Sequence, residues 1–168
     1  MGYSKGGIDS LTAFTIDPEF TKKEIAGLLT IASPHHGAAI LTHLDIPLPV
    51  FDVLTSEDIP EICRKQEKAS PSITPEAMER FYKEKMGTLK DLTRYYSLSF
   101  VSDAKKAHYW MKATKVVAFY KEDNDGVVTI SSSHFPEGLK ALDLGTINAD
   151  HLAGLIETSF PQEAFMEA

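Results

Sequence analysis

The feature that most constrains this chain is a serine set between two glycines near its beginning, in Gly2-Tyr3-Ser4-Lys5-Gly6. This spacing is typical of a sharp strand-to-helix turn, in which the missing side chains at Gly2 and Gly6 admit neighbouring backbone and leave the hydroxyl clear. Such a turn needs a β-strand before the serine and a helix after it. The pattern predicts an α/β fold with Ser4 as a candidate nucleophile, and the alternative is a glycine-rich turn without chemistry.

The residues after the serine favour a helix. Ile8, Leu11 and Phe14 recur at helical spacing, so we expect a helix to begin at Ser4. The first amides of that helix would face the serine. The backbone N–H of Lys5 could then stabilise an oxyanion.

Composition limits the classes of partner. A chain of 168 residues with 43% hydrophobic residues is long enough for one domain with a proper core. Its net charge of −7 argues against a nucleic-acid or anionic-membrane surface and favours a neutral or apolar small-molecule substrate. Cys63 is the single cysteine, which excludes an intrachain disulfide and a multi-cysteine zinc site, and no apolar run is long enough to span a membrane. We expect no cofactor.

Three further segments carry the pattern of buried strands followed by polar loops. Residues 25–32 are almost continuously apolar, as in a parallel strand covered on both faces, and residues 33–37 follow as a loop. We also expect strands at 115–120 and at 139–144, the second ending at Gly145, and a terminal helix from Leu152. The sequence therefore predicts a parallel sheet with helices between its strands.

The segment 44–112 reads as a lid-like insertion, mostly helical and rich in aromatic residues. One helix should begin at Thr74 as N-cap, with Pro75 at its first position, and end at Gly87. A second amphipathic helix is expected around 89–96. The alternative is that these are ordinary crossover helices packed on the sheet. The apolar face of the first helix would carry Met78, Phe81, Tyr82 and the stem of Lys85.

The polar loops occur in an informative order. Ser4 comes first, the turn Asn124-Asp125-Gly126 supplies a carboxylate, and His151 follows near the end of the chain. Serine, then carboxylate, then histidine is the order of the α/β-hydrolase architecture, and it differs from the orders of two unrelated protease folds.

Four stretches together carry a resemblance to a family: residues 2–7, residues 29–37, residues 124–128 and the dipeptide Asp150-His151. They resemble the C-terminal, catalytic half of a lipase or esterase of the α/β-hydrolase superfamily, and the resemblance spans about residues 2 to 156. The resemblance implies a carboxylic ester hydrolase with Ser4 as nucleophile, Asp125 as acid and His151 as base. It also implies that His35 and His36 line the acyl pocket.

Other residues compete for these roles. Asp123 lies close to Asp125 but lacks the following glycine and valine pair, and Asp150 reads as a turn or cap residue. His35 and His36 could instead act as base or bind a metal, although no carboxylate stands nearby at ligand spacing. The histidines without a matching context are read as surface or core residues: His43, His108 and His134.

The resemblance also predicts what should lie outside this chain. In that architecture a strand precedes the nucleophile, and the second oxyanion donor comes from the loop after an earlier strand. We therefore expect a fragment or truncated form of a longer hydrolase, with little activity when isolated. Two alternatives stay open: a catalytically silent half that folds with a partner chain, and an acyltransferase or thioesterase using the same triad.

Overall fold

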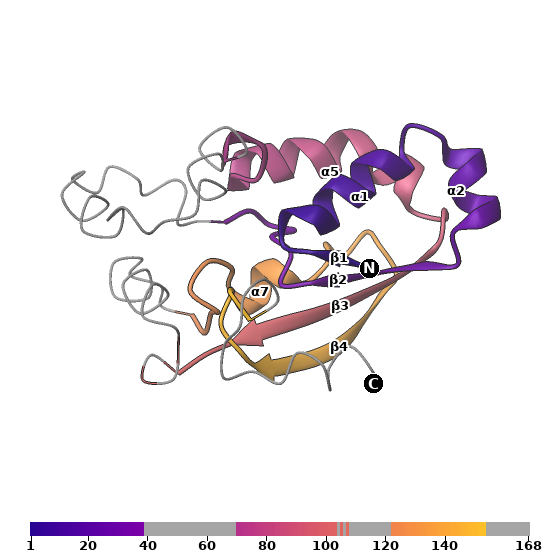
Figure 1. Cartoon of the computed structure of the whole chain (residues 1–168). Helices are drawn as coiled ribbons and strands as arrows, with labels where there is room; N and C mark the ends of the chain where they lie inside the picture. Colours follow the sequence, from indigo (N-terminus) through magenta and orange to yellow (C-terminus); the bar gives the residue numbers. More distant parts are fainter. Residues whose placement is uncertain (39–69, 104, 106, 108–121, 154–168) are drawn as a thin grey trace, which may run out of the picture.

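The computed structural model describes residues 1–38, 70–103, 105, 107 and 122–153 (Figure 1). Its centre is a sheet of four strands in the order β1-β2-β3-β4. The strands are β1 (Gly2–Tyr3), β2 (Gly27–Ile31), β3 (Arg94–Val101) and β4 (Ala141–Asn148). The helices are α1 (Lys5–Phe14), α2 (Pro18–Glu24), η3 (Ser70–Ser72), α5 (Pro75–Leu89) and α7 (Ile130–Ser133).

Every neighbouring pair of strands is parallel, and the order across the sheet follows the order along the chain. The carboxyl ends of all four strands therefore lie at one edge of the sheet. Figure 1 shows α1 and α5 on the same side of the sheet, and residues of both helices belong to one buried apolar cluster. The predicted α/β class, with a parallel sheet flanked by helices, is confirmed.

Two apolar clusters occupy the two faces of the sheet. Because side chains alternate along a strand, Leu28 and Tyr95 point to one face, and Ile31 and Leu98 point to the other. The first cluster joins the sheet to the two long helices through Ile8, Leu11, Met78, Tyr82 and Leu89. The second cluster joins Ile31, Ala32, Leu98 and Phe100 to Ala149 and Ala153, which follow β4.

Close packing around β1 requires glycine at positions 2 and 7, and not at position 6. A Cβ on Gly2 would lie 2.6 Å from Gly7 Cα, and a Cβ on Gly7 would collide with the hydroxyl of Ser33. A Cβ on Gly6 would meet nothing within 4 Å. The expectation that backbone crowds against Gly6 is therefore wrong, because that position faces away from the sheet while Gly7 faces β2.

The helix predicted from Thr74 is confirmed at its start and wrong at its end. The Thr74 side chain accepts a hydrogen bond of 3.2 Å from the Ala77 amide, and Pro75 opens the helix. The helix passes through Gly87 to Leu89, which is fully buried. Burial of that leucine gives the last turn a packing contact that outweighs the weak helix propensity of glycine.

The amphipathic helix expected around 89–96 is wrong. Residues Arg94–Val101 form strand β3, which pairs with β2 on one side and β4 on the other. A helix over 89–96 would place the Tyr95 and Tyr96 side chains on one side, whereas in the strand they point to opposite faces of the sheet. Alternation of serine with Leu98 and Phe100 further along is the strand signal that a window ending at Tyr96 leaves out.

The strand expected at 139–144 is displaced. β4 spans Ala141–Asn148 and continues through Gly145, which has a φ of +98°. The register against β3 shifts between Ser97 and Ser99 beside this glycine, as in a β-bulge. Gly145 therefore bends the strand instead of ending it.

Several predicted segments lie outside the described residues. They are the strand at 115–120, the helix continuing beyond residue 153, His43, His108 and the residues 44–69 of the lid-like insertion. Within 44–112, the described part supplies η3, α5 and the sheet strand β3. The lid-like insertion itself stays a prediction. Across the ranges that the structure describes, no helix has the length and apolar character needed to cross a bilayer.

The contrast between Gly6 and Gly7 can be tested by adding one methyl group at each. Gly7→Ala should lower the free energy of unfolding by about 1–3 kcal/mol, because the methyl overpacks the contact between α1 and β2. Gly6→Ala, the matched control, should leave it unchanged or raise it by less than about 1 kcal/mol. Urea unfolding measures both, and equal losses in the two variants would contradict the packing described.

Candidate active site

Ser4 occupies a strained turn between β1 and α1. Its backbone has φ 50° and ψ −131°, a region that L-residues rarely adopt. The Ser4 amide donates to Ile31 O at 2.8 Å, which continues the β1–β2 ladder to the edge of the sheet. Ser4 stands at the N-cap position of α1, yet its side chain makes no cap hydrogen bond. Its hydroxyl is therefore turned outward from the helix.

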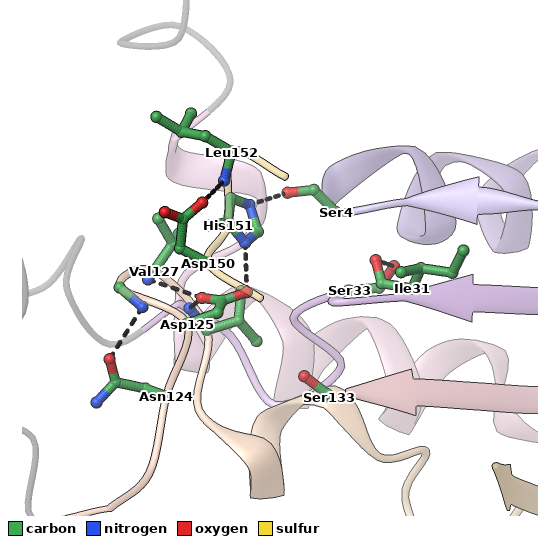
Figure 2. A network of polar contacts seen from close by, with 12 residues as sticks. Ser4, Ile31, Ser33, Asn124, Asp125, Val127, Ser133, Asp150, His151 and Leu152 are labelled. Carbon is green, nitrogen blue, oxygen red and sulfur yellow. Dashed lines mark hydrogen bonds and ion pairs between the residues drawn. The ribbon is translucent and has the colours of Figure 1, made fainter. Parts of the chain in front are cut away.

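The Ser4 hydroxyl meets the His151 ring, and the other side of that ring meets Asp125 (Figure 2). Ser4 Oγ lies 2.8 Å from His151 Nε2, and His151 Nδ1 lies 2.7 Å from Asp125 Oδ2. The three residues come from segments that follow β1, β3 and β4. The structure thus brings together the three side chains predicted as nucleophile, acid and base.

The loop around Asp125 holds that carboxylate rigidly. Asp125 is fully buried, and its Oδ1 accepts hydrogen bonds from the Val127 and Val128 amides at 2.9 and 2.8 Å. Gly126 has a φ of +103°, which closes the predicted turn, and its amide donates to Asn124 Oδ1. The second carboxylate oxygen is left to the histidine. Two backbone amides therefore offset the desolvation of the buried charge.

The partners of His151 fix its tautomer. An ionised carboxylate only accepts hydrogen bonds, so His151 Nδ1 must donate to Asp125 Oδ2. In the neutral ring Nε2 is then the acceptor, and the Ser4 hydroxyl donates to it. The His151 amide also donates to Asp125 O at 2.9 Å. This arrangement has the polarity that proton removal from a serine requires.

The rival carboxylates have other roles. The Asp123 side chain is exposed, and its backbone carbonyl accepts from the Ile130 amide. Asp150 Oδ1 accepts from the Leu152 amide at 2.9 Å, as predicted for a turn residue. Figure 2 shows Asp150 beside the Asp125–His151 pair, with its dashed contact running to Leu152.

His35 lies in the core and does not face Ser4. It is fully buried, with Nε2 2.9 Å from Thr30 Oγ1 and Nδ1 2.6 Å from the Tyr82 hydroxyl. Thr30 Oγ1 also donates to Tyr96 O, so it accepts from His35 Nε2–H, and Nδ1 accepts from Tyr82. Burial, with smaller contributions from His36 and His134, lowers the pKa of His35 to about 3. His35 is thus a neutral, buried group, and the placing of His35 and His36 in the acyl-pocket wall stays a prediction.

His36 and His134 are more exposed than His35. His36 is exposed, and partial desolvation followed by the nearby His134 lowers its pKa. His134 is half-buried, and its Nε2 lies 3.4 Å from Asp143 Oδ2. Among the residues that the structure describes, no three histidine, cysteine or acidic side chains are grouped to hold a metal ion.

The first turn of α1 begins directly behind Ser4. An α-helix leaves its first N–H groups without an acceptor inside the helix, and the Lys5 amide is the first of them. The Gly7 amide, two residues further on, donates to Ser4 O at 3.1 Å. The Lys5 side chain forms an ion pair with Asp9 one turn along the helix. That pairing draws the ammonium along the helix surface, so the backbone amide is the group of Lys5 that stays with the serine.

A depression of about 740 Å³ lies at the opposite end of the sheet. Its lining comes from the beginnings of β3 and β4 and the segment before β2, and includes Ile25, Arg94 and Lys140. The triad is at the carboxyl ends of the strands, so this depression is separate from the serine site.

The sequence patterns did not indicate three sets of tertiary contacts. Gly7 lets α1 approach β2, Tyr82 and Thr30 hold His35, and Tyr3 contacts His151. Gly7 could have been found from the doubled glycine after Ser4. Tyr3 contacts His151, 148 positions away, and Tyr82 contacts His35, 47 positions away, so no local sequence pattern predicts these contacts.

No protein-family model matches the sequence, and the search of curated proteins found no match. Among solved structures, the chain is similar to the mature form of the Bacillus licheniformis lipase BlEst2, with a TM-score of 0.67 and 21% identity. It is also similar to the metagenomic carboxyl esterase MGS0156, with a TM-score of 0.68 and 23% identity. The alignments cover 98% of this chain.

These likenesses show the class of fold: a parallel α/β sheet with flanking helices that matches part of a lipase chain and part of an esterase chain. The chain spans 60% of the mature lipase chain and 48% of the esterase chain. It spans 34% of the propeptide form of the same lipase, at a TM-score of 0.63 and 23% identity. The resemblance read from the sequence is therefore confirmed for the fold.

The buried neutral state of His35 predicts acid sensitivity. In the unfolded chain this histidine takes a proton near pH 6.5, whereas in the folded chain it stays neutral down to about pH 3. Above pH 6.5 this difference has no effect on the free energy of unfolding. As the pH falls below 6.5, the unfolded chain gains a proton that the folded chain does not bind, and the free energy of unfolding decreases by on the order of 1 kcal/mol per pH unit. Urea unfolding at several pH values between 4 and 7 should show this slope. His35→Gln should flatten it and exposed His36→Gln should keep most of it; an unchanged slope in His35→Gln would contradict the assignment.

Proposed function

We propose that this chain carries the catalytic residues of a serine hydrolase that cleaves carboxylic esters through an acyl-enzyme at Ser4. The observation that supports the proposal is the continuous chain of contacts from Ser4 Oγ through the His151 ring to buried Asp125, at 2.8 and 2.7 Å. The fold that it shares with a lipase and a carboxyl esterase makes an ester the favoured substrate.

In the proposed first half-reaction, Ser4 Oγ attacks the ester carbonyl while His151 Nε2 takes the serine proton. Asp125 keeps the ring oriented and stabilises the imidazolium that forms. The Lys5 amide, as a first-turn donor, faces the negative oxygen of the tetrahedral intermediate. The imidazolium then gives its proton to the leaving alcohol, and an acyl group remains on Ser4.

In the second half-reaction, water takes the place of the alcohol. His151 removes a proton from water as it attacks the acyl carbon, and the proton returns to Ser4 Oγ as the ester bond breaks. The products are a carboxylic acid and the free enzyme. The lipase among the structures of similar fold leads us to propose an apolar acyl chain in the substrate.

The nucleophile is tested by covalent labelling. A p-nitrophenyl alkylphosphonate should modify Ser4 and release nitrophenol, and peptide mass spectrometry should locate the adduct. Ser4→Ala should abolish labelling, since triad nucleophiles account for several orders of magnitude in rate. Ser10→Ala is the control. Ser10 lies in α1, the helix that follows Ser4, and its hydroxyl donates to Gly6 O, so this variant should be labelled at the normal rate. An adduct that persists in Ser4→Ala would overturn the proposal.

The acid is tested by comparing two neighbouring aspartates. Asp125→Asn keeps an oxygen for the Val127 and Val128 amides but turns an amide donor toward His151 Nδ1, which forces the wrong tautomer. The labelling rate should fall by about 10³- to 10⁴-fold. Asp123→Asn should change it by less than about twofold. Comparable losses in the two variants, with both folded by circular dichroism, would remove Asp125 from the acid role.

A further inference from the structure

Tyr3 makes contacts that the reaction outlined above does not use. It is half-buried at the end of β1, next to the nucleophile in the chain and opposite Ile31 in the sheet. Its hydroxyl donates a hydrogen bond to the backbone carbonyl of His151. Its ring centroid lies 5.4 Å from the centroid of the His151 imidazole and 6.2 Å from that of Phe100.

Two further hydrogen bonds join His151 to Asp125. Its amide donates to Asp125 O at 2.9 Å, and its Nδ1 lies 2.7 Å from Asp125 Oδ2. Both bonds tie the histidine to the acid loop, and neither reaches β1. The Ser4 hydroxyl meets the ring, at Nε2, and no part of the histidine backbone. The Tyr3 hydroxyl adds a second connection, because it ties the histidine backbone to β1, the strand that directly precedes Ser4.

We propose that Tyr3 is a positioning residue that sets the separation of Ser4 Oγ and His151 Nε2; this inference rests on the proposed function. Tyr3 and Ser4 are consecutive, so any shift of β1 moves the tyrosine hydroxyl and the serine hydroxyl together. His151 is then carried along through its carbonyl. The reacting pair keeps its separation when the end of β1 moves relative to the loop after β4.

A purely structural role for Tyr3 would rest on its ring. The ring packs against the second apolar cluster, with Ile31, Leu98 and Phe100, and phenylalanine would preserve that packing. The hydroxyl is the part that reaches His151. Tyr3→Phe therefore separates the two roles.

Tyr95→Phe is a matched control. The Tyr95 hydroxyl also donates to a backbone carbonyl, that of Leu89, at 2.8 Å. It belongs to the first apolar cluster, on the face of the sheet covered by α1 and α5. Each variant loses one hydrogen bond from a tyrosine hydroxyl to a backbone carbonyl. Only in Tyr3→Phe does that carbonyl belong to His151, the proposed base.

The experiment is phosphonate labelling of the full chain at several reagent concentrations, which separates the maximal rate of Ser4 modification from reagent affinity. Tyr3→Phe should lower the maximal rate about tenfold with affinity unchanged, since a small misplacement of reacting groups acts on the chemical step. Tyr95→Phe should stay within about twofold, while denaturant unfolding should show comparable stability loss in the two variants.

The outcomes separate this inference from the proposed function. If wild-type Ser4 is labelled and Tyr3→Phe reacts as fast as Tyr95→Phe, the positioning role is overturned and the hydrolase proposal stands. A fall in reagent affinity without a fall in maximal rate would likewise overturn it. If wild-type Ser4 is not labelled, the proposed function fails, and this inference fails with it.

Discussion

The close approach of α1 to the sheet is the constraint on which the serine site depends. Gly2 and Gly7 leave no room for a Cβ between the helix, β1 and β2. This contact lets the helix start immediately after the strand, so that Ser4 takes a backbone conformation with φ 50°. Such a conformation costs on the order of 1–3 kcal/mol and persists only where the surrounding packing fixes it. Burial of Ile8 and Leu11 in the first cluster supplies that packing.

The parallel sheet does the rest of the positioning. Because all four strands run the same way, the segments after β1, β3 and β4 arrive at one edge. Two histidines in this region then receive opposite environments. His151 faces an acidic partner and a hydroxyl, whereas His35 lies between two hydroxyl groups in the core, and burial lowers its pKa to about 3. The carboxylate, more than the presence of an imidazole, distinguishes a candidate base from a structural histidine.

Much of this could be predicted where local chemistry is decisive. The turn at Ser4, the N-cap at Thr74 and the left-handed Gly126 follow from the backbone preferences of single residues. The pattern of residues 89–96 predicts a helix because Tyr95 and Tyr96 are compatible with one, and only pairing with β2 and β4 makes these two residues part of a strand. The steric difference between Gly6 and Gly7, and the contacts of Tyr3 and His35, depend on residues distant in the chain. They follow from tertiary structure, which a sequence pattern does not contain.

The central claim is that His151 is a neutral base oriented by Asp125 toward Ser4, and its tautomer tests that claim most directly. Long-range ¹H–¹⁵N correlation spectra of protein labelled with ¹⁵N-histidine report which ring nitrogen carries the proton, and His151→Gln assigns the signals. Near neutral pH the account predicts that His151 carries its proton on Nδ1, because an ionised carboxylate can only accept. A proton on Nε2 of His151 would contradict it.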